Sequence, residues 1–107
     1  MNKELAAQAW EDLFYWAEHD PKLLARILRL IAAIEKSPFT GVGKPEPLKH
    51  SRDGAWSRRI DREHRLIYRV TAKGGTSFCK LLSVEGTMID EGSFATPSAT
   101  TRNLYGR

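Results

Sequence analysis

The fold is indicated first by Trp56-Ser57-Arg58-Arg59-Ile60 and, after a short polar turn, Leu66-Ile67-Tyr68-Arg69-Val70. Both segments have the aromatic and aliphatic content typical of strands, and the turn between them, residues 61–63, is Asp-Arg-Glu. This pattern predicts an antiparallel hairpin. Residues 77–84 are a third strand candidate, and residues 1–8 are a weak first strand. Because side chains alternate along a strand, Arg58 and Arg59 should point to opposite faces of the sheet.

Two helices are predicted before the hairpin. Apolar residues recur at helical spacing over residues 6–18, and we expect Trp10, Leu13, Phe14 and Ala17 to be buried. Asp20-Pro21 supplies an N-cap and a proline at the first helical position of a second helix, which should run to residue 36. Ser37-Pro38 ends that helix. Its buried face is predicted to hold Leu23, Leu24, Ile27, Leu30, Ile31 and Ile34.

Length and composition indicate one domain. The 107 residues are 41% hydrophobic and 28% charged, which is enough for a single modest core. The lone Cys79 excludes an internal disulfide and fits a reducing compartment. No apolar run approaches the roughly 20 residues of a membrane span, and the N-terminus lacks a signal-peptide core, so we expect a cytoplasmic protein without a membrane partner. Metal-ligand spacing is absent from the Cys and His positions, and we expect no zinc site.

A stiff, charged loop precedes the hairpin. In Gly43-Lys44-Pro45-Glu46-Pro47-Leu48-Lys49, two prolines restrict the backbone around one carboxylate, Glu46. From residue 41 to residue 70 there are eight basic and four acidic residues, a surplus equal to the formal net charge of +4. A carboxylate held in a cationic region suggests acid–base chemistry on a polyanion. The same pattern also fits a solvated loop residue, which is the alternative interpretation of Glu46.

Several sequence blocks together resemble the YoeB toxins of the RelE superfamily: Trp10-Glu11-Asp12, Tyr15-Trp16, Pro38-Phe39, residues 43–49, Trp56-Ser57-Arg58-Arg59-Ile60, and Glu63-His64-Arg65-Leu66 with Tyr68. The resemblance spans about residues 10–71. It implies a small α+β domain, with two helices packed on a twisted, mainly antiparallel sheet over residues 1–84. It also implies the toxin of a type II toxin–antitoxin pair, a ribosome-dependent messenger-RNA endonuclease neutralised by a YefM-type antitoxin. A homodimer is left open.

The resemblance further implies metal-free cleavage without a cofactor, in which a base activates the 2′-hydroxyl group. Glu46 would be that base, and Arg65 would stabilise charge on the phosphoryl group. Arg59, Lys49 and Lys44 are the next candidates for contact with RNA phosphates. Glu46 and Arg65 should face one cleft. His64 is expected to be structural and Trp56 to be core, with base stacking as the alternative for Trp56.

The C-terminal part departs from the family pattern. YoeB toxins end in an Arg-aromatic-His-Tyr sequence whose His protonates the leaving group, whereas this chain has no histidine after His64 and runs on to Arg107. If the codons of residues 78–90 are read one base earlier, permitted choices of the third codon base give the sequence LQIAQCRGHYD followed by a stop codon. We therefore hypothesise a shift of the reading frame near residues 75–77. Residues 85–107 should form a disordered tail.

Three functions remain open at this point. The first is a ribonuclease of reduced rate, and the second is an inactive variant that still binds antitoxin or ribosome. The third, a gyrase-directed relative of the superfamily, is disfavoured by the blocks around Glu46 and Arg65.

Overall fold

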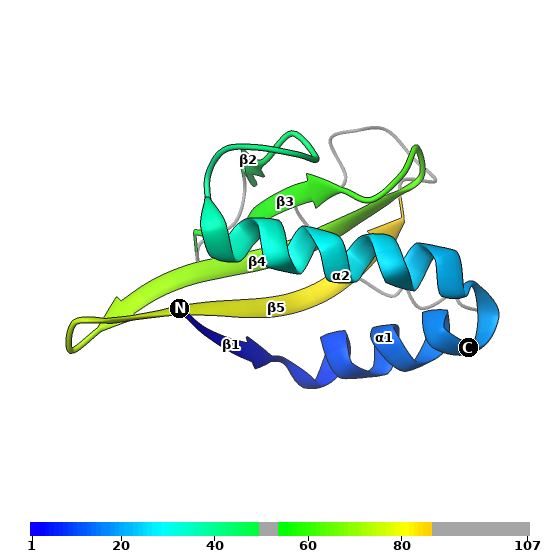
Figure 1. Ribbon diagram of the computed structural model, residues 1–107, viewed down its shortest axis with the longest axis horizontal. Coiled ribbons are helices and arrows are strands. Elements are labelled where there is room, and N and C mark those ends of the chain that lie inside the picture. The colour runs from blue at the N-terminus through cyan, green and yellow to red at the C-terminus, as the bar shows by residue number, and fades with distance from the viewer. Residues whose placement is uncertain (50–53, 87–107) are drawn as a thin grey trace.

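A computed structural model of the chain describes residues 1–49 and 54–86 (Figure 1). Strand β1 (Asn2–Leu5) leads into helices α1 (Ala7–His19) and α2 (Pro21–Lys36). The remaining strands are β2 (Glu46–Pro47), β3 (Trp56–Arg59), β4 (His64–Lys73) and β5 (Thr76–Gly86). They form one sheet in the order β1-β5-β4-β3-β2, in which β1 pairs parallel to β5 and every other neighbour is antiparallel. The α+β fold predicted from the sequence is confirmed.

Local sequence explains where the helices begin and end. The Asp20 side chain accepts a hydrogen bond from the backbone N–H of Leu23 at 3.2 Å, and Pro21 occupies the first turn of α2. Such a cap is worth about 1 kcal/mol. Ser37 ends the helix, as predicted. The stiff loop predicted over residues 43–49 contains the short strand β2, which the sequence did not reveal because two residues carry no recognisable period.

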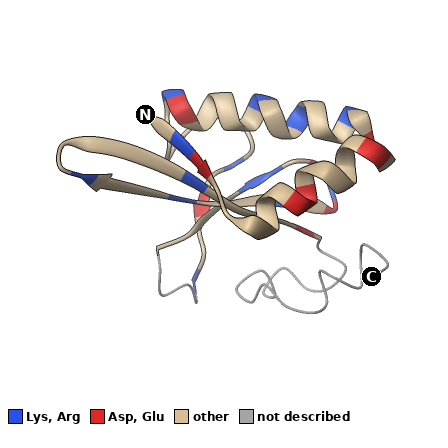
Figure 2. Ribbon diagram, turned by 90° about the horizontal axis from the view of Figure 1, so that it is seen from below, with Lys and Arg blue, Asp and Glu red and all other residues tan. Residues whose placement is uncertain are grey.

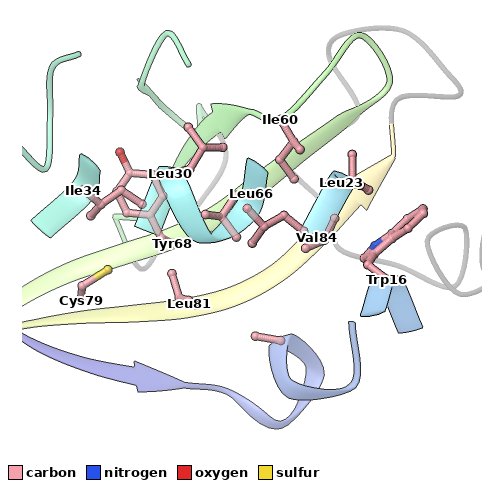
Figure 3. Packing of buried hydrophobic residues seen from close by; sticks show 12 residues of the cluster. Trp16, Leu23, Leu30, Ile34, Ile60, Leu66, Tyr68, Cys79, Leu81 and Val84 are labelled. Carbon is pink, nitrogen blue, oxygen red and sulfur yellow. The ribbon is translucent and has the colours of Figure 1, made fainter. Parts of the chain in front are cut away.

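Both helices pack on one face of the sheet (Figures 1 and 2). Ile27 and Ile34 of α2 are fully buried against Leu66 and Tyr68 of β4 and Leu81 of β5, in the core shown in Figure 3. The exposed Lys3 Nζ lies 2.8 Å from Glu35 Oε2 and joins the edge strand β1 to α2. Among the residues that the structure describes, no helix is long and apolar enough to cross a membrane.

The buried face of α1 differs from the prediction. Its buried residues are Ala9, Asp12 and Trp16, whereas Trp10 and Phe14 are 54% and 56% exposed. The rings of these two exposed residues make an edge-to-face contact at 5.1 Å. The helical spacing of apolar residues did not identify the buried face, because a polar residue, Asp12, takes a core position and the neighbouring aromatic side chains turn outward.

Candidate functional site

The sheet has a second face, opposite the helices, and the strand register assigns side chains to it. Ser57, Ile67 and Ser83 are aligned across β3, β4 and β5. Two residues along, Arg59, Arg65 and Glu85 form the next aligned row. We call the face that carries these two rows the charged face. Ile67 also belongs to a small apolar cluster, together with Ala55 and with Leu48 and Leu82 packed against them.

Glu46 and Arg65 are brought together on the charged face. Glu46 lies on β2, where it pairs with Ser57, and its side chain is 61% exposed. The Nη1 atom of Arg65 lies 3.6 Å from its Oε1 atom, and the Arg65 side chain is only 13% exposed. At this separation the two groups are an ion pair but not a hydrogen-bonded one. An anion could therefore enter between them without breaking a tight contact.

The other predicted contact residues surround this pair. Arg59 is exposed and is the direct cross-strand neighbour of Arg65. Lys44 and Lys49 are exposed on either side of β2. Lys44 adopts a φ of +49°, an uncommon conformation for a residue with a side chain, which belongs to the sharp turn that delivers Glu46.

A buried arginine shapes that turn from the other side of the sheet. Arg58 points to the face opposite Arg59, as alternation predicts, and it is fully buried there. Its guanidinium group donates hydrogen bonds to the backbone carbonyls of Val42 at 2.9 Å, Thr40 at 2.8 Å and Ser37. The Tyr68 hydroxyl accepts a bond from Arg58 and donates one to the Pro38 carbonyl at 2.7 Å. Residues 37–42 are therefore tied to the hairpin from inside the core.

A backbone hydrogen bond and a neutral tyrosine support the same turn. The Gly43 carbonyl accepts a hydrogen bond from the Arg59 backbone N–H at 2.7 Å, immediately before Lys44. Burial raises the pKa of Tyr68 above its usual value, although the nearby Arg58 partly opposes the shift. Tyr68 therefore stays a neutral hydrogen-bond donor. The turn before Glu46 is therefore hydrogen-bonded to the hairpin at Val42 and at Gly43.

His64 has a structural setting, in agreement with the sequence interpretation. Its Nδ1 atom lies 3.0 Å from Asp61 Oδ1, and its ring contacts Trp16 of α1 edge-to-face at 4.9 Å. Burial alone would raise the pKa of Asp61, but hydrogen bonds from Glu63 and His64 outweigh it and the pKa is lowered. His50 and Tyr105 lie outside the described residues.

Glu85 is the residue of the charged face that the sequence analysis missed. It is 4% exposed, and the Ser83 hydroxyl donates a hydrogen bond to its Oε2 atom at 2.8 Å. The sequence predicted a strand over residues 77–84, which stops one residue before Glu85, whereas the observed strand continues to Gly86. Without the pairing register, nothing placed this carboxylate opposite Arg65.

Comparison with known proteins gives a consistent result. Residues 5–80 match the family described as YoeB-like toxin of bacterial type II toxin-antitoxin system. A YoeB toxin of Streptomyces coelicolor is 55% identical over 71 residues, which cover 66% of this chain and 84% of that protein. The solved YoeB/ParE toxin from Agrobacterium tumefaciens is 37% identical with a TM-score of 0.73, over 78% of this chain and 96% of that one. The toxin in a heterotetrameric YoeB–YefM complex from Staphylococcus aureus is also 37% identical, with a TM-score of 0.65, over 78% and 92%.

Proposed function

Because the chain belongs to the YoeB-like toxins of bacterial type II toxin–antitoxin systems, we propose that it acts on messenger RNA as a ribosome-dependent endonuclease in the cytoplasm. The observation that supports this proposal best is the 3.6 Å separation of Glu46 Oε1 and Arg65 Nη1 on one face. A base and a phosphate-binding cation must stand this close to act on one phosphodiester bond.

The proposed reaction starts at Glu46. Its carboxylate accepts the proton of the 2′-hydroxyl group, and the resulting alkoxide attacks the adjacent phosphorus atom. Arg65 binds the non-bridging oxygens and stabilises the charge that develops on them, an effect worth about 2–4 kcal/mol at comparable sites. Arg59, Lys44 and Lys49 hold the neighbouring phosphates. The bond to the 5′ oxygen breaks last, and that oxygen needs a proton.

The source of that proton is where this chain differs from its family. By resemblance the family uses a C-terminal histidine, oriented by a tyrosine, which the chain does not have at the corresponding place. Loss of a general acid typically lowers the rate by about 10²–10⁴-fold. We therefore propose a slow enzyme, with an inactive variant that still binds its antitoxin or the ribosome as the second candidate.

Cleavage of messenger RNA on translating ribosomes in vitro tests the catalytic assignment. Glu46→Gln and Arg65→Gln should each lower the rate by about 10²-fold or more. Glu18→Gln, which removes a carboxylate from the exposed surface of α1, is the matched control and should leave the rate unchanged. Replacement of residues 78–107 by the shifted-frame ending should raise the rate. Cleavage by Glu46→Gln at the rate of the unaltered chain would refute the assignment.

The antitoxin partner is tested separately. The surplus of Lys and Arg between residues 41 and 70 supports binding to an acidic antitoxin segment, and the S. aureus relative is solved with YefM. Calorimetric titration with a YefM-type antitoxin should give an affinity that falls as salt rises from 50 to 300 mM. Absence of binding by the folded chain at low salt would exclude this partner. The homodimer remains a further proposal, to be measured by sedimentation.

A further inference from the structure

The direction of Glu85 is set by an irregularity in β5. Tyr68 pairs with Leu81 whereas Ile67 pairs with Ser83, so Leu82 is an extra residue in the strand. Under strict alternation, Leu81, Ser83 and Glu85 would share one face. The extra residue shifts the alternation, and Leu81 and Val84 both enter the core, at 2% and 1% exposure. Ser83 and Glu85 consequently belong to the charged face.

A buried carboxylate from the helix layer holds this part of β5 in place. Asp12 of α1 is fully buried, and its Oδ2 atom accepts a hydrogen bond from the Val84 backbone N–H at 2.9 Å. Gln8 donates a second bond to Asp12 at 2.6 Å. Val84 lies between Ser83 and Glu85, so this contact fixes the strand where it presents Glu85 to the charged face.

The row that contains Glu85 is a row of charges. Arg59 on β3, Arg65 on β4 and Glu85 on β5 are consecutive cross-strand partners. Directly opposed residues in an antiparallel pair have Cβ atoms about 5 Å apart, well inside the Debye length of about 10 Å at 0.1 M salt. The backbone of Glu85 therefore lies beside that of Arg65, and a charge buried at that place is screened only weakly by salt.

We propose that Glu85 is a counter-charge: its negative charge opposes the positive charge of Arg65 and so weakens the binding of RNA phosphate to the charged face. Glu46 stands on the edge strand β2 and Glu85 on β5, with Arg59 on β3 and Arg65 on β4 between them. A phosphate that reaches Arg65 meets the field of both carboxylates. Glu46 is exposed and can move aside, whereas Glu85 is buried and tied to Ser83, so its charge remains.

This inference rests on the proposed function, since it presumes that Arg65 binds RNA phosphate. Glu85→Gln removes the charge and keeps the size and the acceptor for Ser83. We expect it to bind a fluorescent, fully 2′-O-methylated single-stranded RNA about three- to tenfold more tightly at 50 mM salt. The slope of log affinity against log salt should steepen by about 0.7, the value for one additional effective charge on a single strand. Glu18→Gln makes the same change in net charge on the helix layer and should alter neither quantity.

Two further variants separate the outcomes. Arg65→Gln should weaken binding in both the original and the Glu85→Gln background. If Arg65→Gln changes nothing, the RNA-binding role of Arg65 fails, and the proposed function fails with it. If Arg65→Gln weakens binding but Glu85→Gln leaves affinity and slope unchanged, or weakens binding, the counter-charge is refuted while the proposed function stands. Should Glu85→Gln unfold, Glu85→Ala carries the same expectations.

Discussion

Replacement of the buried Arg58 by methionine should destabilise the protein strongly, although Arg58 is not part of the charged face. Methionine fills a similar volume but donates no hydrogen bond. The substitution removes the bonds to the carbonyls of Ser37, Thr40 and Val42, which tie the loop after α2 to the hairpin. The Tyr68 hydroxyl keeps its bond to Pro38, so one tie to the loop remains.

The size of the effect follows mainly from those three bonds, because the fourth bond of Arg58, to the Tyr68 hydroxyl, is long at 3.3 Å. A hydrogen bond to a charged group contributes about 1.5–3 kcal/mol net. Ser37, Thr40 and Val42 are exposed, so their carbonyls can turn to water when the guanidinium group is lost. Methionine also avoids the cost of burying a charge. We therefore take about 1 kcal/mol for each bond and expect a loss of about 3 kcal/mol in the free energy of unfolding. For a domain of this size, that corresponds to a decrease of about 12–24 °C in Tm.

Urea denaturation and thermal unfolding measure this change directly. Arg29→Met, on the exposed surface of α2, is the matched control and should stay within about 0.5 kcal/mol of the unaltered chain. Arg58→Lys should recover little of the loss, because an ammonium group cannot span three carbonyls as a planar guanidinium group does. Limited proteolysis should cut between residues 37 and 43 faster in both Arg58 variants. A Tm for Arg58→Met within 3 °C of the unaltered chain would show that the carbonyl bonds add nothing to stability.

Two further predictions concern a glycine and a buried thiol. Gly43→Ala should lower the free energy of unfolding by more than about 1 kcal/mol, since φ is +87° there and a Cβ atom would meet Leu30 Cδ2 at 3.0 Å and Arg59 O at 3.1 Å. Gly74→Ala, at φ +58° with open space around it, should cost less, and equal losses in urea denaturation would contradict the crowding argument. Burial, assisted by the negative charge of Glu35, raises the pKa of Cys79 to about 11 from an ordinary value of 9.0. The thiol therefore favours folding below pH 9, and this contribution should fade as the pH rises through 11. The stability difference between the original chain and Cys79→Ala should shrink over that range, and a constant difference would argue against the shift.

The parts of the fold that sequence alone could predict are those with short-range causes. Asp20-Pro21 fixes the start of α2 through contacts within one turn, and the apolar spacing in α2 was sufficient to identify its buried face. The hairpin of β3 and β4 followed from two strand-like segments and a polar turn. These features need no knowledge of distant residues, which is why α2 was recovered nearly to the residue, whereas β4 extends beyond the predicted residues 66–70 at both ends.

The errors and omissions have long-range causes. Asp12 is buried in α1 because its partner is the Val84 backbone, 72 residues away, and this one contact explains why Trp10 and Phe14 face outward. The partners of Arg58 lie 16 to 21 residues earlier in the chain, so alternation predicted its direction but not its role. The association of Glu46 with Arg65 was expected from the family resemblance, and residue spacing alone would have left Glu46 a solvated loop residue.

The extra residue in β5 determines which chemical group each face of the sheet receives. Towards the turn between β4 and β5, alternation places Cys79 and Leu81 in the core. If Leu82 were regularly paired, the same alternation would place Ser83 and Glu85 beneath the helices. A carboxylate there would face apolar side chains, at a cost of several kcal/mol. With the extra residue, Val84 fills the core instead and Glu85 is set opposite Arg65. The stability of the core and the charge of the charged face are therefore coupled through the irregular pairing at Leu82.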